Sequence, residues 1–288
     1  MHILIYGTIN SFSLALMAIG FALVYGISRL PNFAHGALYV VTGFIVWSFI
    51  HILDIHYIAG ILLSLIITGL VGAAIYQFIL IRVRGMATSE IIASYAIGLA
   101  ILEWLRWRGF KGMTYTLPVF IEGSIEIAGV PVDLQRIIVV GIGAVVVAFL
   151  WLFTHYNRIG LALRGMAQDE RAAMMLGIDS DFMALIAMAL GSVLAGLAAV
   201  VLLPLGNIVV EKGYDVLILA IAVCIVGGLG SWVGAVLAAF MIGFAQIITV
   251  EYIASHFHMV VALLAIIITL ILRPSGLFGR QKELEERV

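Results

Sequence analysis

Long apolar stretches separated by short polar breaks dominate the chain. About 20 consecutive apolar residues are needed for a helix to cross the hydrocarbon core of a membrane, and most of these stretches approach or exceed that length. The candidate spans are residues 3–28, 33–50, 57–81, 88–108, 136–155, 182–205, 215–231, 234–252 and 257–272. Two of them, 33–50 and 215–231, are short and interrupted by glycine, so each is a candidate re-entrant or broken helix. The pattern predicts an all-α polytopic membrane protein with about 8–9 transmembrane or re-entrant helices.

Composition supports this class. Of the 288 residues, 64% are hydrophobic and 11% are charged, whereas about a quarter of the residues in a soluble domain are charged. A soluble enzyme and a nucleic-acid binder are therefore excluded. The single cysteine, Cys224, excludes a disulfide framework. No Lys or Arg precedes Arg29, so the positively charged start of a cleavable signal peptide is missing and the first span is expected to be retained.

The positions of Lys and Arg indicate an orientation, because cytoplasmic loops are enriched in these residues. With nine spans and an external N-terminus, the cytoplasmic side carries ten of them and the external side five. The cytoplasmic set is Arg29, Arg82, Arg84, Arg158, Arg164, Arg171, Arg273, Arg280, Lys282 and Arg287, and the external set is Arg106, Arg108, Lys111, Arg136 and Lys212. If one of the short segments is re-entrant, the predicted side of the membrane is reversed for every connection that precedes it.

The polar connections divide the chain without separating it into domains. We expect one transmembrane domain over residues 1–288, with an external loop at about 109–134 that contains a short amphipathic or strand-like piece. A cytoplasmic loop at about 156–181 carries the densest charge, and a charged cytoplasmic tail covers 279–288. The tetrapeptide Arg-Gly-Met-Ala at residues 84–87 recurs at 164–167, which raises the hypothesis of an internal duplication.

The usual motifs of membrane enzymes and nucleotide hydrolases are absent. The sequence has no His-Glu-x-x-His zinc motif and no Gly-x-Ser-x-Gly nucleophile turn, and its seven histidines are scattered. No Gly-Lys dipeptide occurs, so no phosphate-binding Walker loop can be written. We expect neither an enzyme nor a metal site, and any ATP-driven process requires a separate ATPase that contacts a cytoplasmic surface.

The cytoplasmic loop contains a candidate for that surface. Good helix formers extend from Gln168 to Leu176, acids lie near the start where the helix dipole favours them, and Gly177 suits the C-terminal cap. We expect a short helix with an apolar face formed by Ala172, Met175 and Leu176, while Asp169, Glu170 and Arg171 face water. The alternative is a solvated helix that merely joins two spans. 

Two other segments are candidate parts of a translocation path. Asn32, His35 and Gly36 follow Pro31 and begin a helix whose exposed N–H groups are suited to a solute carboxylate. The alternative is that Asn32 caps this helix and His35 bonds a neighbouring carbonyl. The glycine-rich run 227–231 disfavours a helix interior, and its members Gly227, Gly228, Gly230 and Ser231 form either a path lining or hinge, or a simple bend with close packing.

Four ordered motifs resemble those of the branched-chain amino acid ABC transporter permeases. They are Asn32–Gly36, Gly160–Ile178, Gly227–Gly234 and Leu272–Gly279, and together they cover essentially the whole chain. Within the second motif, Glu170, Ala172, Ala173 and Gly177 resemble a one-residue variant of the Glu-Ala-Ala-x-x-x-Gly signature by which importer permeases engage their ATPases. Pro31 departs from the apolar residue that similar permeases usually carry.

The resemblance, which is to the first of the two permease subunits, implies a multi-pass plasma-membrane subunit of an ATP-driven importer for a small organic solute such as a branched-chain or other hydrophobic amino acid. It implies a related but different second permease, two cytoplasmic ATPases that bind ATP and Mg, and an external solute-binding protein, with no cofactor on this chain. The residues implied to engage the ATPases are Arg164, Gln168, Asp169, Glu170, Ala172, Ala173, Met175, Leu176 and Gly177.

A secondary transporter or channel that works without an ATPase is the alternative. Such a protein usually carries ionisable residues at mid-membrane, and few are found in these spans. The sequence does not choose among solutes.

Overall fold

The computed structural model describes residues 1–29, 31–109 and 114–279. Its long helices are α1 (His2–Ser28), α2 (His35–His51), α3 (Tyr57–Ile75), α5 (Ala87–Trp104), α6 (Leu134–Tyr156), α9 (Ser180–Leu202), α10 (Glu211–Gly227), α11 (Trp232–Tyr252) and α12 (His258–Leu272). The shorter elements are η1 (Tyr76–Leu80), α4 (Ile81–Val83), η2 (Leu105–Gly109), β1 (Ser124–Ile127), β2 (Val130–Asp133), α7 (Arg158–Gln168), α8 (Glu170–Met175), η3 (Leu203–Leu205) and η4 (Ser255–Phe257). Predictions for residues 110–113 and for the tail residues 280–288 lie outside the described residues.

Every predicted span coincides with a helix, and the all-α polytopic fold is confirmed. Within the described residues, seven helical stretches are long and apolar enough to cross a membrane. Helices α2 and α10 have 17 residues each, about 25 Å of rise, which is shorter than a hydrocarbon core of about 30 Å. The prediction for residues 215–231 was displaced: α10 begins at Glu211 and ends at Gly227, because Gly228 adopts a φ of 100° that ends the helix.

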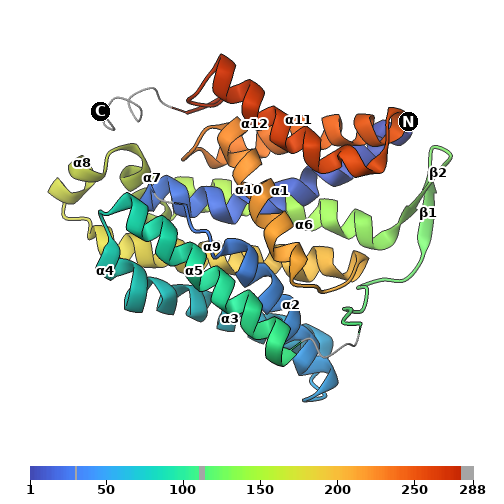
Figure 1. Cartoon of the computed structure of the whole chain (residues 1–288), viewed down its shortest axis with the longest axis horizontal. Coiled ribbons are helices and arrows are strands. Elements are labelled where there is room, and N and C mark those ends of the chain that lie inside the picture. The colour runs from blue at the N-terminus through green and yellow to red at the C-terminus, as the bar shows by residue number, and fades with distance from the viewer. Residues whose placement is uncertain (30, 110–113, 280–288) are drawn as a thin grey trace.

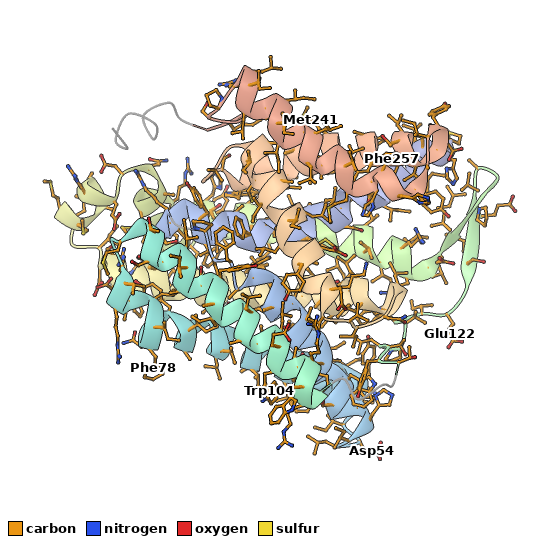
Figure 2. The ribbon with its side chains drawn as sticks, viewed as in Figure 1. Asp54, Phe78, Trp104, Glu122, Met241 and Phe257 are labelled. Carbon is orange, nitrogen blue, oxygen red and sulfur yellow. The ribbon has the colours of Figure 1, made fainter. Side chains whose placement is uncertain are left out.

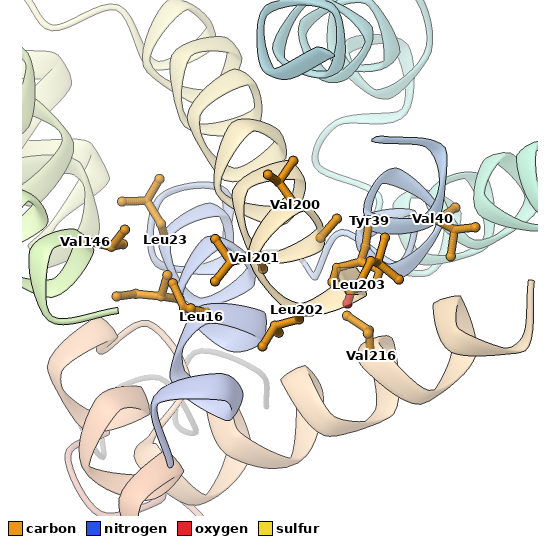
Figure 3. Packing of buried hydrophobic residues seen from close by; sticks show 14 of the residues in the cluster. Leu16, Leu23, Tyr39, Val40, Val146, Val200, Val201, Leu202, Leu203 and Val216 are labelled. Atoms are coloured by element: carbon orange, nitrogen blue, oxygen red, sulfur yellow. The ribbon is translucent and has the colours of Figure 1, made fainter. Parts of the chain in front are cut away.

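Helix α1 forms the centre of the bundle and packs against α6, α9, α10 and α11 (Figure 1). Small residues allow these close approaches, as in other membrane helix pairs. A Cβ placed on Gly20 would lie 2.7 Å from the carbonyl oxygen of Gly191 in α9, and one on Gly243 of α11 would lie 2.5 Å from the Ser11 hydroxyl. Figure 3 shows the adjoining core, where Leu16 and Leu23 of α1 lie near the end of α9.

The connections at the two ends of the bundle differ in structure: short helices lie at one end and a β-hairpin lies at the other (Figure 1). Elements α4, α7 and α8 lie at one end, which we call the α8 end. The antiparallel hairpin β1–β2 and the N-terminus lie at the other, the hairpin end. Ala128 and Gly129 turn the hairpin with positive φ values of 51° and 82°, and the Tyr6 hydroxyl donates a 2.8 Å hydrogen bond to the Pro131 carbonyl. The expected strand-like piece in the 109–134 loop is confirmed.

The outer surface of the bundle is apolar, as a lipid-facing surface requires. Phe78, Trp104 and Met241 project outward from their helices (Figure 2), and their side chains are exposed. The exposed leucines and isoleucines of α12 continue this surface. Charged residues such as Asp54 and Glu122 lie on connections instead (Figure 2).

Candidate functional site

The predicted 168–176 helix is divided at Asp169. Gln168 ends α7, Asp169 has extended backbone angles (φ −155°, ψ 104°), and α8 contains only Glu170–Met175. The Asp169 carboxylate caps α8 by accepting a 3.0 Å hydrogen bond from the Ala172 N–H. Aspartate is a preferred N-cap residue, because its side chain satisfies an N–H that has no partner within the helix. The single helix expected from the sequence was wrong in this respect.

The C-terminal cap of α8 is the one that Gly177 predicts. Gly177 has a φ of 84°, its N–H donates to the Met174 carbonyl over 3.0 Å, and the Ile178 N–H donates to the Ala173 carbonyl over 3.2 Å. These two bonds form a Schellman motif, in which glycine is favoured because a left-handed residue without a Cβ is unstrained. The cap stops α8 sharply and leads the chain into α9.

The exposed side of α8 is apolar. Met175 and Leu176 are 88% and 83% exposed, Ala172 is exposed beside them, and Met174 is half-exposed. Ala173, by contrast, is buried against the bundle and fixes which side of α8 faces inward. Exposed apolar side chains grouped on a short helix form a surface suited to a protein partner, and methionines adapt readily to such a surface.

Glu170 does not face water as expected. Its Oε1 accepts a 3.0 Å charged hydrogen bond from the Arg84 guanidinium and a 2.6 Å bond from the Ser180 hydroxyl. The expectation failed because Arg84 lies 86 positions earlier in the chain, so only the tertiary fold brings the two groups together. Arg171 and Asp169 are exposed as expected.

A cavity of about 350 Å³ lies at the α8 end between α1, α6, α7 and the start of α11. Arg164 and Gln168 of α7 line it, as do Gly230 and Ser231 of the connection between α10 and α11. Thr154 and His155 of α6 add further polar groups to the lining. Two groups of residues that the sequence assigned to separate roles, ATPase coupling and translocation, therefore meet at one cavity.

The glycine-rich segment 227–231 ends α10 and supports the C-terminal segment. The Leu277 and Phe278 N–H groups donate to the carbonyls of Val226 and Gly227 over 2.9 and 3.0 Å. These carbonyls are at the end of a helix and would otherwise lack partners. A Cβ on Gly228 would lie 2.3 Å from the Gly279 nitrogen, so glycine is required there. The third and fourth sequence motifs thus pack against each other.

Asn32, His35 and Gly36 lie elsewhere, in the interior on another side of α1. His35 begins α2, and its Nε2 is 2.9 Å from the Met17 carbonyl in the middle of α1. The Asn32 side-chain oxygen accepts a 3.0 Å bond from the Ala34 N–H. A Cβ on Gly36 would lie 1.9 Å from the Gly213 carbonyl oxygen, so α2 and α10 are in direct backbone contact. The His35 contact matches the alternative of a structural helix start, whereas the N-cap position of α2 is occupied by Ala34 and not by Asn32. A path role for the three residues stays a prediction.

Several polar residues at the α8 end were not singled out from the sequence. Arg84, Tyr76, Ser180 and Asp181 meet around Glu170. Burial would lower the pKa of the Arg84 guanidinium, but its contacts with Tyr76, Asp181 and Glu170 raise that pKa above its ordinary value, so it stays charged. The repeated Arg-Gly-Met-Ala is the one signal in the sequence that points to Arg84. The two copies differ in structure, because 84–86 connects α4 to α5, which begins at Ala87, whereas 164–167 lies inside α7.

Among the described residues, no group of three or more His, Cys, Asp or Glu side chains is arranged to hold a metal ion. 

Comparison with known proteins identifies the family. The family model described as the permease component of the branched-chain amino acid transport system matches residues 3–271. The chain belongs to this family. This permease is thus a multi-pass protein of the inner membrane, and its family consists of membrane permease components rather than known enzymes.

Two curated relatives cover nearly the whole permease. The high-affinity branched-chain amino acid transport system permease protein BraD of Pseudomonas aeruginosa is 30% identical over 281 residues, which are 92% of this chain and 91% of that protein. The probable branched-chain amino acid transport permease protein LivH of Methanocaldococcus jannaschii is 28% identical over 284 residues, which are 92% of this chain and 88% of that protein.

A solved structure shares the fold. PsaBC from Streptococcus pneumoniae in complex with Fab contains a chain that superposes with a TM-score of 0.51 at 16% identity, covering 100% of this permease and 96% of that chain. 

Proposed function

We propose that this permease is the first of two related permease subunits in an ATP-driven importer, and that the α8 end faces the cytoplasm. Two ATPase subunits, which bind ATP and Mg, dock there, and an external solute-binding protein delivers the solute at the hairpin end. The second permease is a different chain of the same family. Family membership supports the importer over a secondary transporter or channel.

The observation that carries the proposed docking is the exposed face of α8. Met175 and Leu176 project away from the bundle on a helix that is capped at both ends. Exposing two such side chains on a well-ordered element is unfavourable in water unless a partner covers them, at roughly 25 cal/mol per Å² of apolar surface. The predicted coupling residues Arg164 and Gln168 line the cavity beside α8, where motion of the ATPases can reach Gly230 and Ser231.

We propose a branched-chain amino acid as the solute, because the names of BraD and LivH state that substrate class for the relatives. An importer uses the external binding protein for much of its selectivity. The residues of this chain that contact the solute are proposed to lie along the cavity lined by Gly230 and Ser231, with Asn32, His35 and Gly36 as the second candidate segment.

Uptake into proteoliposomes tests this function. The complete complex, reconstituted with the binding protein, should accumulate radiolabelled leucine only when ATP is supplied on the ATPase side. The permease alone should give no flux in ATP-free vesicles. Leucine flux through the permease alone would instead favour the channel or secondary transporter, and ATP-driven uptake of another solute in place of leucine would change the substrate class while retaining the mechanism.

A further inference from the structure

A charged cluster at the α8 end joins the segment that ends at Arg84 to α8 and to the start of α9, which follow it by more than 80 residues. It consists of Tyr76, Arg84, Glu170, Ser180 and Asp181, which we call the Arg84 cluster. The Arg84 guanidinium bonds Glu170 of α8 at 3.0 Å and also bonds Ser180 and Asp181 at the start of α9. The Tyr76 hydroxyl donates to the Asp181 carboxylate over 3.3 Å.

The Arg84 cluster helps to hold α8 in its orientation, because α8 is too short to be stable on its own. Helix α8 has six residues, far fewer than the roughly 12 that an isolated helix needs for marginal stability in water. The outer face of α8 is not stabilised by packing against the bundle, because Met175 and Leu176 are exposed. On its inner side, Ala173 supplies a small apolar contact, and Glu170 supplies a charged one through Arg84.

Two of the segments that meet at Arg84, the helical stretch that precedes it and α9, pack closely together. Arg84 directly follows α3, η1 and α4, which form one helical stretch from Tyr57 to Val83. A Cβ on Gly72 of that stretch would lie 1.9 Å from the Ser192 hydroxyl of α9, and one on Gly69 would lie 2.8 Å from Val193. Contacts this close, with no room for a Cβ, make α3 and α9 a tightly packed pair.

We propose that Arg84 is a positioning residue for transport, which transmits displacement of α8 to the α3–α9 pair. Its planar guanidinium has donors enough to bond Glu170 and Asp181 at once, which a lysine ammonium does less well. When a docked ATPase moves α8, the Arg84 contacts move the cytoplasmic ends of both membrane helices with it. This inference rests on the proposed function, since it requires that ATPases dock on α8.

A purely structural role is the competing explanation. Partly exposed ion pairs contribute little to stability, and the side chains of Arg84, Glu170 and Asp181 are 21%, 33% and 56% exposed. Loss of Arg84 should therefore leave the fold intact while it breaks the link between α8 and the helical stretch from Tyr57 to Val83; the bond from the Ser180 hydroxyl to Glu170 still joins α8 to α9. The quantity that separates the two roles is the number of solute molecules transported per ATP hydrolysed.

The test uses the complete complex in proteoliposomes, with leucine uptake and ATP hydrolysis measured on the same preparation. Arg84→Ala should keep ATP hydrolysis near the wild-type rate and lower uptake per ATP about tenfold, within the range typical of coupling residues. Arg84→Lys should lower it less, because the charge is kept. The matched control is Arg82→Ala, which removes an exposed cation two positions earlier and should behave as wild type.

Two outcomes would overturn the proposal. A wild-type ratio of uptake to hydrolysis in Arg84→Ala would show that Arg84 transmits nothing, and equal losses of uptake and hydrolysis would indicate docking or assembly instead. If Arg84→Ala does not assemble, Arg84→Lys decides, since a wild-type ratio in that variant would also contradict the proposal. Absence of ATP-driven uptake in the wild-type complex would instead refute the proposed function, which keeps the two failures distinct.

Discussion

Replacing Gly177 with alanine changes the cap of α8 and nothing else nearby. Gly177 adopts a φ of 84°, and a Cβ built on it would meet no atom within 4 Å. The substitution therefore introduces no clash, and its whole cost is the strain of a left-handed alanine. That cost is about 1–2 kcal/mol. 

The strain acts directly on the cap because α8 is short. Two hydrogen bonds, from Gly177 to Met174 and from Ile178 to Ala173, depend on the left-handed residue. Disfavouring that conformation by about 1–2 kcal/mol shifts the equilibrium from capped toward frayed α8 by a factor of roughly 5 to 30. If the ATPases bind only capped α8, the apparent dissociation constant rises toward the same factor.

The assay is a titration of the ATPase subunits onto the detergent-solubilised permease. Gly177→Ala should weaken binding by up to that factor, and Gly177→Asn should weaken it less, because asparagine tolerates the left-handed conformation. Gly165→Ala is the matched control: Gly165 lies inside α7, a Cβ on it also meets nothing within 4 Å, and alanine favours a helix interior. Equal binding by Gly177→Ala and Gly165→Ala would refute the role assigned to the cap.

Two further outcomes follow from the structure. Leu176→Asp, at a side chain 83% exposed, should abolish copurification of the ATPases without changing membrane insertion. Ile125→Asp on the hairpin should leave copurification unchanged. Loss of copurification in both variants would count against α8 as the specific docking surface. Gly36→Ala places a Cβ 1.9 Å from the Gly213 carbonyl oxygen, so thermal unfolding in detergent should show a loss of about 1–3 kcal/mol in the free energy of unfolding. The control Gly141→Ala, whose Cβ meets no atom within 4 Å, should leave that free energy unchanged. An unchanged unfolding midpoint for Gly36→Ala would show that α2 and α10 are not in contact as described.

Local patterns predicted much of the fold. The apolar runs located all of the long helices, because a membrane span must satisfy its backbone hydrogen bonds within one helix. Glycine predicted the helix end at Gly177, which has a positive φ that other residues disfavour. The glycine run 227–231 indicated a break from helix, but the predicted span 215–231 still ran through it, whereas α10 ends at Gly227. A strand-like piece in the 109–134 loop was also expected from local sequence, although its pairing into a hairpin was not.

Contacts between distant segments could not be predicted in this way. The pattern favoured one helix through Asp169, because an aspartate inside the first turn and an aspartate at the N-cap look alike in sequence. The pairing of Glu170 with Arg84 depends on how α3 and α9 pack. The burial of His35 against α1 likewise depends on the tertiary fold, so a helix start that looked available to solute lies in the interior.

Site-specific photocrosslinking from position 175 most directly tests the claim that ATPases act on this permease through α8. A photoreactive residue in place of Met175, which is 88% exposed, is introduced into the complete complex in native membranes. The account predicts a crosslink to an ATPase subunit whose yield changes between nucleotide-free and ATP-bound states. A crosslink only to lipid or to an external protein, or none in any nucleotide state, would contradict it.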